Sequence, residues 1–238
     1  IIGIVLPIYI FIYMITNKKT NEVERKRIYS YIPLFITSVA FWMIQEQGST
    51  VLANFADQNT QLSMSKLTNG LIDFQIPAAW AQSLNPIFIV VLAPVFANLW
   101  TRLGKHNPST VHKFALGAIF AGLSYLVMMI PLMSSTELTH PLWLALSFLF
   151  ITVGELCISP VGLSVTSKLA PKHLSAQMMA LWMLSNATAQ SINSQTVVFF
   201  KRISEQQFFM YSGLFTLIIG VLLFLISPIV IRAMRGVH

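Results

Sequence analysis

The sequence predicts an all-α membrane protein. Of its 238 residues, 55% are hydrophobic and only 10% are charged, whereas about a quarter of the residues of an average soluble domain are charged. The apolar residues form runs about as long as the roughly 20 residues that cross the hydrocarbon core of a bilayer. Backbone groups inside lipid must find their hydrogen-bond partners within the chain, so we expect these runs to be helices.

Seven apolar segments follow one another along the chain. The first, within residues 1–17, begins without methionine and without the basic flank of a signal peptide, and we expect it to be the end of a helix of a longer protein. Residues 18–28 are polar and basic and are expected to form a cytoplasmic linker, and residues 29–238 are expected to form a bundle of six membrane helices. The six spans are predicted at about 29–55, 78–101, 112–133, 141–167, 174–200 and 208–231.

Basic residues fall almost entirely into alternate connections between these spans. Twelve of the 15 lysines and arginines lie in the first connection, near 102–113, near 168–172 and at the C-terminus, whereas the other connections hold Lys66, Lys201 and Arg202. The positive-inside rule therefore predicts that the basic connections and the C-terminus are cytoplasmic. This topology explains the net charge of +7, and we expect no nucleic-acid partner.

Two acids, Glu46 and Glu155, lie well inside apolar spans. An acid at that depth costs about 2.5–3.5 kcal/mol on insertion scales and indicates a functional site by default. No lysine or arginine of the sequence lies at the depth of either acid, so we expect a cationic partner from another helix bundle or from a ligand. A protonated, hydrogen-bonded structural carboxyl is the alternative interpretation.

The residues around both acids follow helical spacing, and a third span shows the same pattern. A polar stripe on a membrane helix faces protein or a water-filled cavity. Hydrogen bonding between helices is the favoured interpretation for the serines taken singly, and a cavity is favoured for the acids and tryptophans. The stripes consist of Trp42, Gln45, Glu46 and Ser49, of Thr152, Glu155, Ser159 and Gly162, and of Trp182, Ser185, Asn186, Ala189 and Asn193.

The sequence offers little for catalysis or metal binding. A single cysteine, Cys157, cannot supply a disulfide within the chain or a multi-cysteine metal site. Intramembrane proteases need paired aspartates, a serine–histidine pair or a His-Glu-x-x-His motif, and the predicted spans contain no aspartate and no histidine at mid-depth. We therefore expect neither an enzyme nor a metal or organic cofactor.

Three separated segments, in order along the chain, resemble the proton-dependent oligopeptide transporter family. Residues 41–57 (FWMIQEQGSTVLANFAD) are similar to its seventh helix, residues 76–86 (IPAAWAQSLNP) to the entry into its eighth helix, and residues 154–163 (GELCISPVGL) to its tenth helix. The resemblance implies the bacterial type of this family and the C-terminal six-helix bundle of a major facilitator fold. Residues 1–17 would then be the end of an extra helix between the two bundles.

The resemblance also implies roles for individual residues. Glu155 resembles the acid that meets the peptide's amino terminus and takes part in proton coupling, and Asn85 its helper at that amino group. Glu46 resembles the acid of proton coupling and of the outer gate, which closes against an arginine of the N-terminal half. Gln45 occupies a substrate-site position that is often acidic in the family, so a second acid at this gate is absent here.

Trp42 and Trp182 resemble aromatic walls of side-chain pockets, and Ser185 a small polar contributor to substrate binding. The implied function is proton-coupled symport of di- and tripeptides by alternating access across the bacterial cytoplasmic membrane. The implied partners are the peptides, protons, the lipid bilayer and an N-terminal six-helix half. A major facilitator carrier for another small solute and a non-transporting peptide sensor remain as alternatives.

Overall fold

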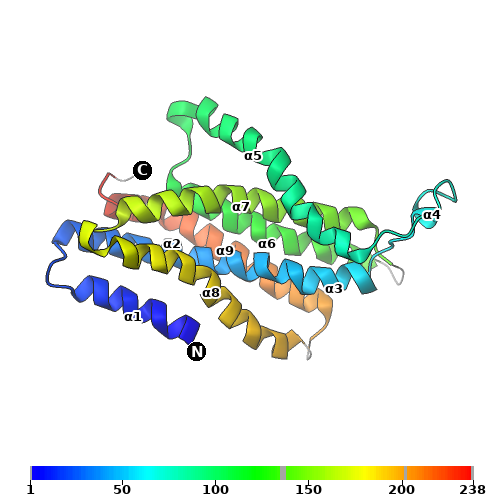
Figure 1. The fold of residues 1–238 in the computed structure, drawn as a ribbon, viewed down its shortest axis with the longest axis horizontal. Coiled ribbons are helices and arrows are strands. Elements are labelled where there is room, and N and C mark those ends of the chain that lie inside the picture. Colours follow the sequence, from blue (N-terminus) through cyan, green and yellow to red (C-terminus); the bar gives the residue numbers. More distant parts are fainter. Residues whose placement is uncertain (1, 135–137, 201–202, 237–238) are drawn as a thin grey trace.

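The computed structural model is almost entirely helical (Figure 1) and describes residues 2–134, 138–200 and 203–236. Outside the helices, two isolated bridges join Thr60 to Thr139 and Ser63 to Gln75. The predicted all-α class is confirmed. The α-helices are α1 (Ile2–Thr16), α2 (Glu22–Glu46), α3 (Val51–Gln58), α4 (Met64–Leu67), α5 (Leu84–Leu103), α6 (Thr110–Ser134), α7 (Pro141–Leu169), α8 (Ser175–Phe200) and α9 (Glu205–Ala233).

The first full span begins earlier than predicted and is broken once. Its helix α2 starts at Glu22, because Asn21 forms a capping box in which its side chain accepts from the Glu24 N–H and the Glu24 carboxylate accepts from the Asn21 N–H. Such caps satisfy backbone donors that have no partner within the helix. After Glu46 the chain passes through a short 3₁₀ turn, Gln47–Ser49, and continues as α3. The predicted span at about 29–55 is therefore confirmed as helical, with a 3₁₀ turn inside it that was not predicted.

Five helical segments in the described part of the chain are long and apolar enough to cross a membrane: 22–58, 78–106, 110–133, 141–169 and 205–233. The remaining long helix, α8, also occupies a predicted span, but polar residues crowd it from Ser185 onward, among them Asn186, Gln190 and Asn193. These segments indicate a multi-pass membrane protein.

Helices α6, α7 and α9 pack closely through small residues. A Cβ added to Gly122 of α6 would lie 2.7 Å from the backbone oxygen of Gly213 of α9. Likewise, a Cβ on Gly154 of α7 would lie 2.7 Å from the backbone oxygen of Gly117 of α6. Small residues let membrane helices approach to backbone contact. These three helices therefore form a tightly packed layer behind α2.

Helix α5 is packed differently from the others. It has no buried residue, and its main helical neighbour is α7. Figure 1 shows its C-terminal part leaning away from the bundle. Large apolar side chains on it, such as Val90 and Val95, are more than half exposed. In a membrane protein such a surface lies against lipid or against further protein.

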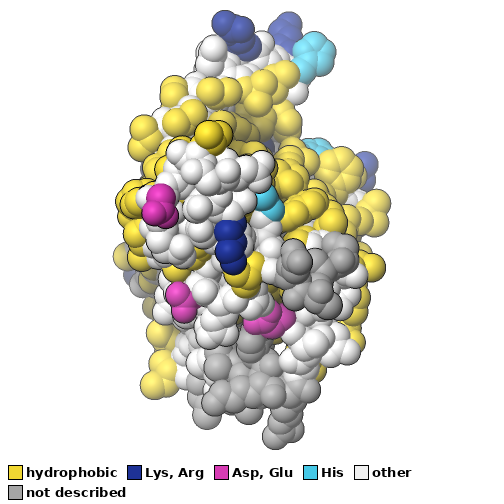
Figure 2. Space-filling view, turned by 90° about the vertical axis from the view of Figure 1, so that its right-hand side faces the viewer, with side chains coloured by type: hydrophobic (Ala, Val, Ile, Leu, Met, Phe, Trp, Pro, Cys, Tyr) yellow, Lys and Arg dark blue, Asp and Glu magenta, His cyan; other side chains and the backbone are white. Residues whose placement is uncertain are grey.

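The basic connections share one end of the bundle. The α1–α2, α5–α6 and α7–α8 connections and the C-terminus all lie at the left of Figure 1, and α4, which contains Lys66, lies at the other end. Figure 2 looks onto that other end, where acidic side chains are spread over mostly uncharged surface. Lys201 and Arg202 lie outside the described residues. Which end faces the cytoplasm stays a prediction.

Candidate functional site

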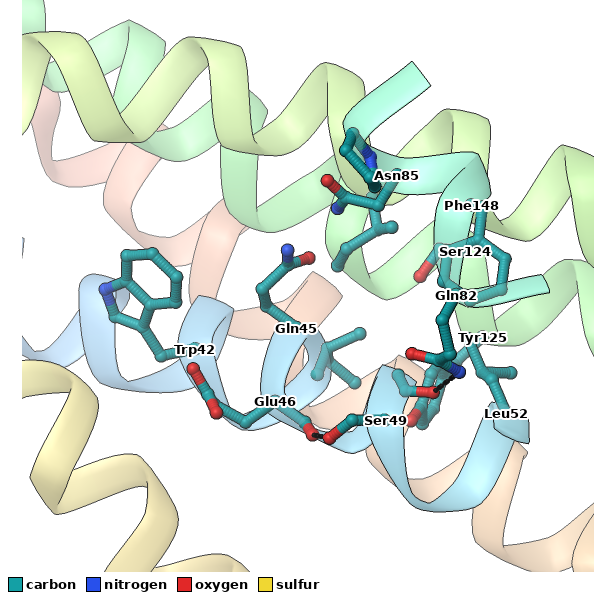
Figure 3. Close-up of a pocket in the computed structure, with 14 residues that line it drawn as sticks. Trp42, Gln45, Glu46, Ser49, Leu52, Gln82, Asn85, Ser124, Tyr125 and Phe148 are labelled. Carbon is teal, nitrogen blue, oxygen red and sulfur yellow. Dashed lines mark hydrogen bonds between the residues drawn. The ribbon is translucent and has the colours of Figure 1, made fainter. Parts of the chain in front are cut away.

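Helix α2 presents its polar residues in two directions. Gln45 and Glu46 are adjacent, so their side chains leave the helix about 100° apart. Gln45 points toward α5 and α7, whereas Glu46 contacts α8 (Figure 3). The break after Glu46 exposes backbone oxygens that side chains then satisfy: Gln82 donates to the oxygen of Gly48 at 2.9 Å, and Ser49 donates to that of Glu46 at 3.0 Å.

Glu155 of α7 is partly buried and receives two amide hydrogen bonds from two other helices. Gln45 Nε2 of α2 donates to Glu155 Oε2 at 2.9 Å, and Asn85 Nδ2 of α5 donates to the same oxygen at 3.2 Å. Among the described residues, no side chain donates to Glu155 Oε1 and no cation pairs with the carboxylate. One oxygen is thus held in place, and the other remains an acceptor for an additional group.

Glu46 has both of its carboxylate oxygens occupied. Asn186 Nδ2 of α8 donates to Oε1 at 2.6 Å, and Gln190 Nε2 donates to Oε2 at 3.0 Å. Gln190 also donates to Asn186 Oδ1 at 2.9 Å, which closes a ring of three side chains. The sequence analysis missed Gln190. It lies four residues after Asn186, on the same helical face, so its spacing could have identified it.

A cavity of about 280 Å³ lies between α2, the start of α5, α6 and α7 (Figure 3). Glu155 does not line it, but Gln45 and Asn85, which donate to Glu155, both do. Its polar lining includes Gln45, Glu46 and Asn85 of the predicted site, together with the aromatic ring of Trp42. A second hollow of about 510 Å³ lies between α2–α3 and α8, and Glu46 lines this one as well. Glu46 therefore lines both hollows.

A buried network supports the helix break from behind. Gln47 is only 5% exposed and accepts from the hydroxyl of Tyr125 at 3.1 Å. Its amide donates to Asn193 Oδ1 at 2.8 Å, and Asn193 in turn donates to the backbone oxygen of Met43 at 3.0 Å. Buried polar groups of this kind need partners. The network links α2, α6 and α8 directly next to Glu46.

Two predicted site residues lie apart from this cavity. Trp182 is 7% exposed, and its ring packs so closely on Gly162 that an added Cβ there would lie 2.1 Å from it. Ser185 is fully buried and donates to the backbone oxygen of Trp182 at 2.7 Å. The structure thus places Trp42, Gln45, Glu46 and Asn85 around one cavity and joins Glu155 to it through the Gln45 and Asn85 amides. Trp182 and Ser185 lie within the packing of α8 instead.

Comparison with known proteins gives consistent matches. The model of the POT family matches residues 1–220. An uncharacterized transporter, YclF, from Bacillus subtilis is 50% identical over 238 residues. A di-/tripeptide transporter from Lactococcus lactis subsp. cremoris is 42% identical over 240 residues. Each alignment covers 100% of this chain but only 47% and 48% of the relative, so the chain spans about half the length of these relatives.

Solved structures match in the same way. A peptide transporter POT in complex with sulfate is 50% identical, with a TM-score of 0.91 over 99% of this chain and 46% of the other. A POT family transporter in complex with 5-aminolevulinic acid is 37% identical, with a TM-score of 0.89 over 96% of this chain and 47% of the other. The likeness extends over α1 and the helices that follow. It confirms the predicted fold class, a six-helix major facilitator bundle preceded by the end of an extra helix.

Proposed function

Because the chain belongs to the POT family, we propose that it forms the C-terminal half of a proton-coupled symporter of di- and tripeptides. In this proposal residues 29–238 form the C-terminal bundle, residues 18–28 a cytoplasmic linker and residues 1–17 the end of the inter-bundle helix. The di-/tripeptide transporter of Lactococcus lactis that this chain resembles supports the substrate class. The observation that carries the proposal is the open oxygen of Glu155.

Glu155 is the proposed binding group for the peptide's amino terminus. Two amides fix its Oε2, and Oε1 has no donor among the described residues. A peptide ammonium could donate to Oε1 and neutralise a charge that is expensive at this depth. Hydrogen bonds between charged groups contribute about 1.5–3 kcal/mol. Gln45 and Asn85 act as positioning residues in this proposal, because they hold the carboxylate at a defined angle.

Glu46 is the proposed proton-coupling group of the outer gate. Its carboxylate accepts two amide hydrogen bonds from α8. A proton on either oxygen would turn an acceptor into a donor and force Asn186 or Gln190 to reorient. Protonation of Glu46 would therefore change the contact between α2 and α8. A change of contact at a helix interface can shift the balance between inward-open and outward-open states.

An N-terminal bundle is the proposed partner of this surface. The cavity of about 280 Å³ is at the lower limit of ligand pockets, which commonly measure about 300–1,000 Å³. A bundle facing α2, α5, α7 and α8 would complete the cavity and cover the exposed side of α5. It would also supply the cations that the two acids lack within the described residues. We place the assembly in the bacterial cytoplasmic membrane with the C-terminus inside.

The driving force is sufficient for accumulation. One charge moved across the membrane contributes about 2.3 kcal/mol per 100 mV, and each pH unit adds about 1.4 kcal/mol. Since about 1.4 kcal/mol corresponds to tenfold in concentration, one proton per neutral zwitterionic peptide supports more than tenfold accumulation. Alternating access would couple the movement of the proton to the movement of the peptide.

The test is uptake of labelled dialanine into proteoliposomes that contain the full-length protein, with an inward pH gradient. We expect uphill uptake by the wild type and no proton-driven uptake by Glu155→Gln. Dialanine binding without any flux would instead indicate a peptide sensor. Neither binding nor flux for any small peptide, with folded protein, would refute the proposed substrate class. Substantial active accumulation by Glu155→Gln would refute the assigned role of Glu155.

A further inference from the structure

A third hollow, which neither acid lines, lies toward the end of the bundle where the basic connections gather. It measures about 480 Å³ and is wedged between the C-terminal end of α5, the start of α6 and the C-terminal half of α7. No acidic residue lines it. Its polar lining is Trp100, Asn107, Ser109, Thr110, Lys113, Ser164 and Lys168.

Lys113 is the unusual residue of this hollow. Its side chain is only 9% exposed, and its ammonium lies 4.4 Å from the centre of the Trp100 ring. No acidic side chain of the described residues pairs with it. A cation over an aromatic face is attracted to it, but its charge is not neutralised. A buried charge without a counter-ion is costly, so the site favours an anion.

Two further features of the hollow supply hydrogen-bond donors. The indole Nε1–H of Trp100 is buried and has no hydrogen-bond partner. The 25-residue helix α6 begins at Thr110, in the wall of the hollow. In this first turn the His112 N–H already donates to the Ser109 hydroxyl, which leaves the N–H groups of Thr110 and Val111 as donors, and the helix dipole favours negative charge there. The hollow therefore combines a buried cation, an unused donor and a helix start.

We propose that this hollow binds the phosphate of an anionic phospholipid in the leaflet at the basic end of the bundle. Basic pockets between membrane helices at this level suit such head groups. Leu99 of α5, next to Trp100 in the chain, is 42% exposed and apolar, as expected for a surface that an acyl chain covers. Free phosphate offers the same acceptor chemistry but no apolar tail. The proposal does not depend on which solute is transported.

The test is native mass spectrometry of the full-length protein, titrated with phosphatidylglycerol, with phosphatidylcholine or with inorganic phosphate. We expect selective retention of phosphatidylglycerol that inorganic phosphate does not displace. Lys113→Gln should lower the retained fraction about fivefold, the order expected for one basic contact with an anionic lipid. Lys105→Gln is the matched control, since Lys105 is exposed in the same connection and does not line the hollow.

A second variant keeps the test decisive if Lys113→Gln fails to fold. Ser164 is exposed on α7 and lines the hollow, so Ser164→Asp adds a carboxylate there while Lys113 and Trp100 stay in place. It should also lower retention of phosphatidylglycerol. Equal retention by the wild type, Lys113→Gln and Ser164→Asp would overturn the proposal. Binding of inorganic phosphate without selectivity for phosphatidylglycerol would overturn the lipid assignment.

Discussion

The two acids in the apolar spans both involve helix α2, which carries Glu46 and donates to Glu155 through Gln45, but their environments differ. At Glu155 two amides, from α2 and α5, converge on one oxygen and leave the other open. At Glu46 two amides of α8 take one oxygen each. Both acids lack a cationic partner among the described residues. The difference between them is therefore in acceptor capacity, not in charge.

This difference suggests a division of roles between the two acids. An open, positioned oxygen can receive an ammonium without disturbing the protein. A carboxylate with a donor on each oxygen has fewer free lone pairs for a ligand, and its protonation must rearrange the side chains that donate to it. Glu155 is thus suited to substrate binding and Glu46 to a switch between helices.

Replacing each acid by its amide should give the largest effects, and different ones. Glu155→Gln removes the charge that meets the ammonium, so we expect dialanine affinity to fall about 10- to 100-fold. Glu46→Gln should keep affinity within about threefold but abolish uphill accumulation while peptide exchange continues. Binding titrations and proteoliposome flux, measured on the same preparations, separate the two outcomes. Equal loss of affinity in both variants would break the division of roles.

Removing the amide that helps to hold Glu155 should have an intermediate effect. In Asn85→Ala the carboxylate keeps only the Gln45 hydrogen bond, and a lost hydrogen bond costs about 0.5–1.5 kcal/mol. We expect dialanine affinity to fall about two- to tenfold, as measured by competition with a labelled peptide. Asn98→Ala is the control, because Asn98 is an exposed amide on the same helix. An equal loss in both variants would point to a general effect on α5.

Removing one amide at Glu46 should change coupling more than binding. Gln190→Ala deletes one of the two hydrogen bonds that α8 donates to Glu46. We expect the accumulation ratio under a pH gradient to fall a few-fold, on the order of one hydrogen bond, with dialanine affinity nearly unchanged. Gln195→Ala, at an exposed position of α8, serves as the matched control. A drop in affinity without a drop in accumulation would contradict the role given to Glu46.

The smallest effect is expected at Ser185. Its hydroxyl is fully buried and donates to the backbone of its own helix, so Ser185→Ala removes no group that lines the cavity. We expect dialanine affinity and accumulation to stay within about twofold of the wild type, since a single hydrogen bond contributes on the order of 1 kcal/mol or less. A loss of tenfold or more would show that Ser185 reaches the substrate after all, as the family resemblance implies.

The helical fold was predictable because hydrophobic run length is a strong signal in a membrane protein. Two details of the fold could not be predicted from hydrophobic run length. The early start of α2 depends on the Asn21–Glu24 capping box, which lies in a segment too polar for a hydropathy criterion. The break after Glu46 has no proline to signal it; it is stabilised by Gln82, which lies 34 residues further along the chain. Long-range partners of this kind are invisible to local patterns.

The site was predictable in part. The position of Glu46 and Glu155 well inside apolar spans identified both acids as candidate site residues. The family resemblance implied that Asn85 assists Glu155 at the peptide's amino group. The bond from Gln45 to Glu155 joins residues 110 positions apart, and no spacing rule predicts it. The Trp182 ring lies inside the bundle because α8 packs closely on Gly162 of α7. Which face of α8 meets α7 depends on packing between specific side chains. Helical spacing alone places residues on a common face but does not say what that face meets.

The most direct test of the central claim compares dialanine with N-acetyl-dialanine as competitors for labelled peptide. The two competitors differ in the ammonium that Glu155 is proposed to bind. We expect the wild type to discriminate strongly against the acetylated peptide and Glu155→Gln to discriminate little, while Glu46→Gln discriminates as the wild type does. Full discrimination by folded Glu155→Gln protein would contradict the account, because another group would then be the one that recognises the amino terminus.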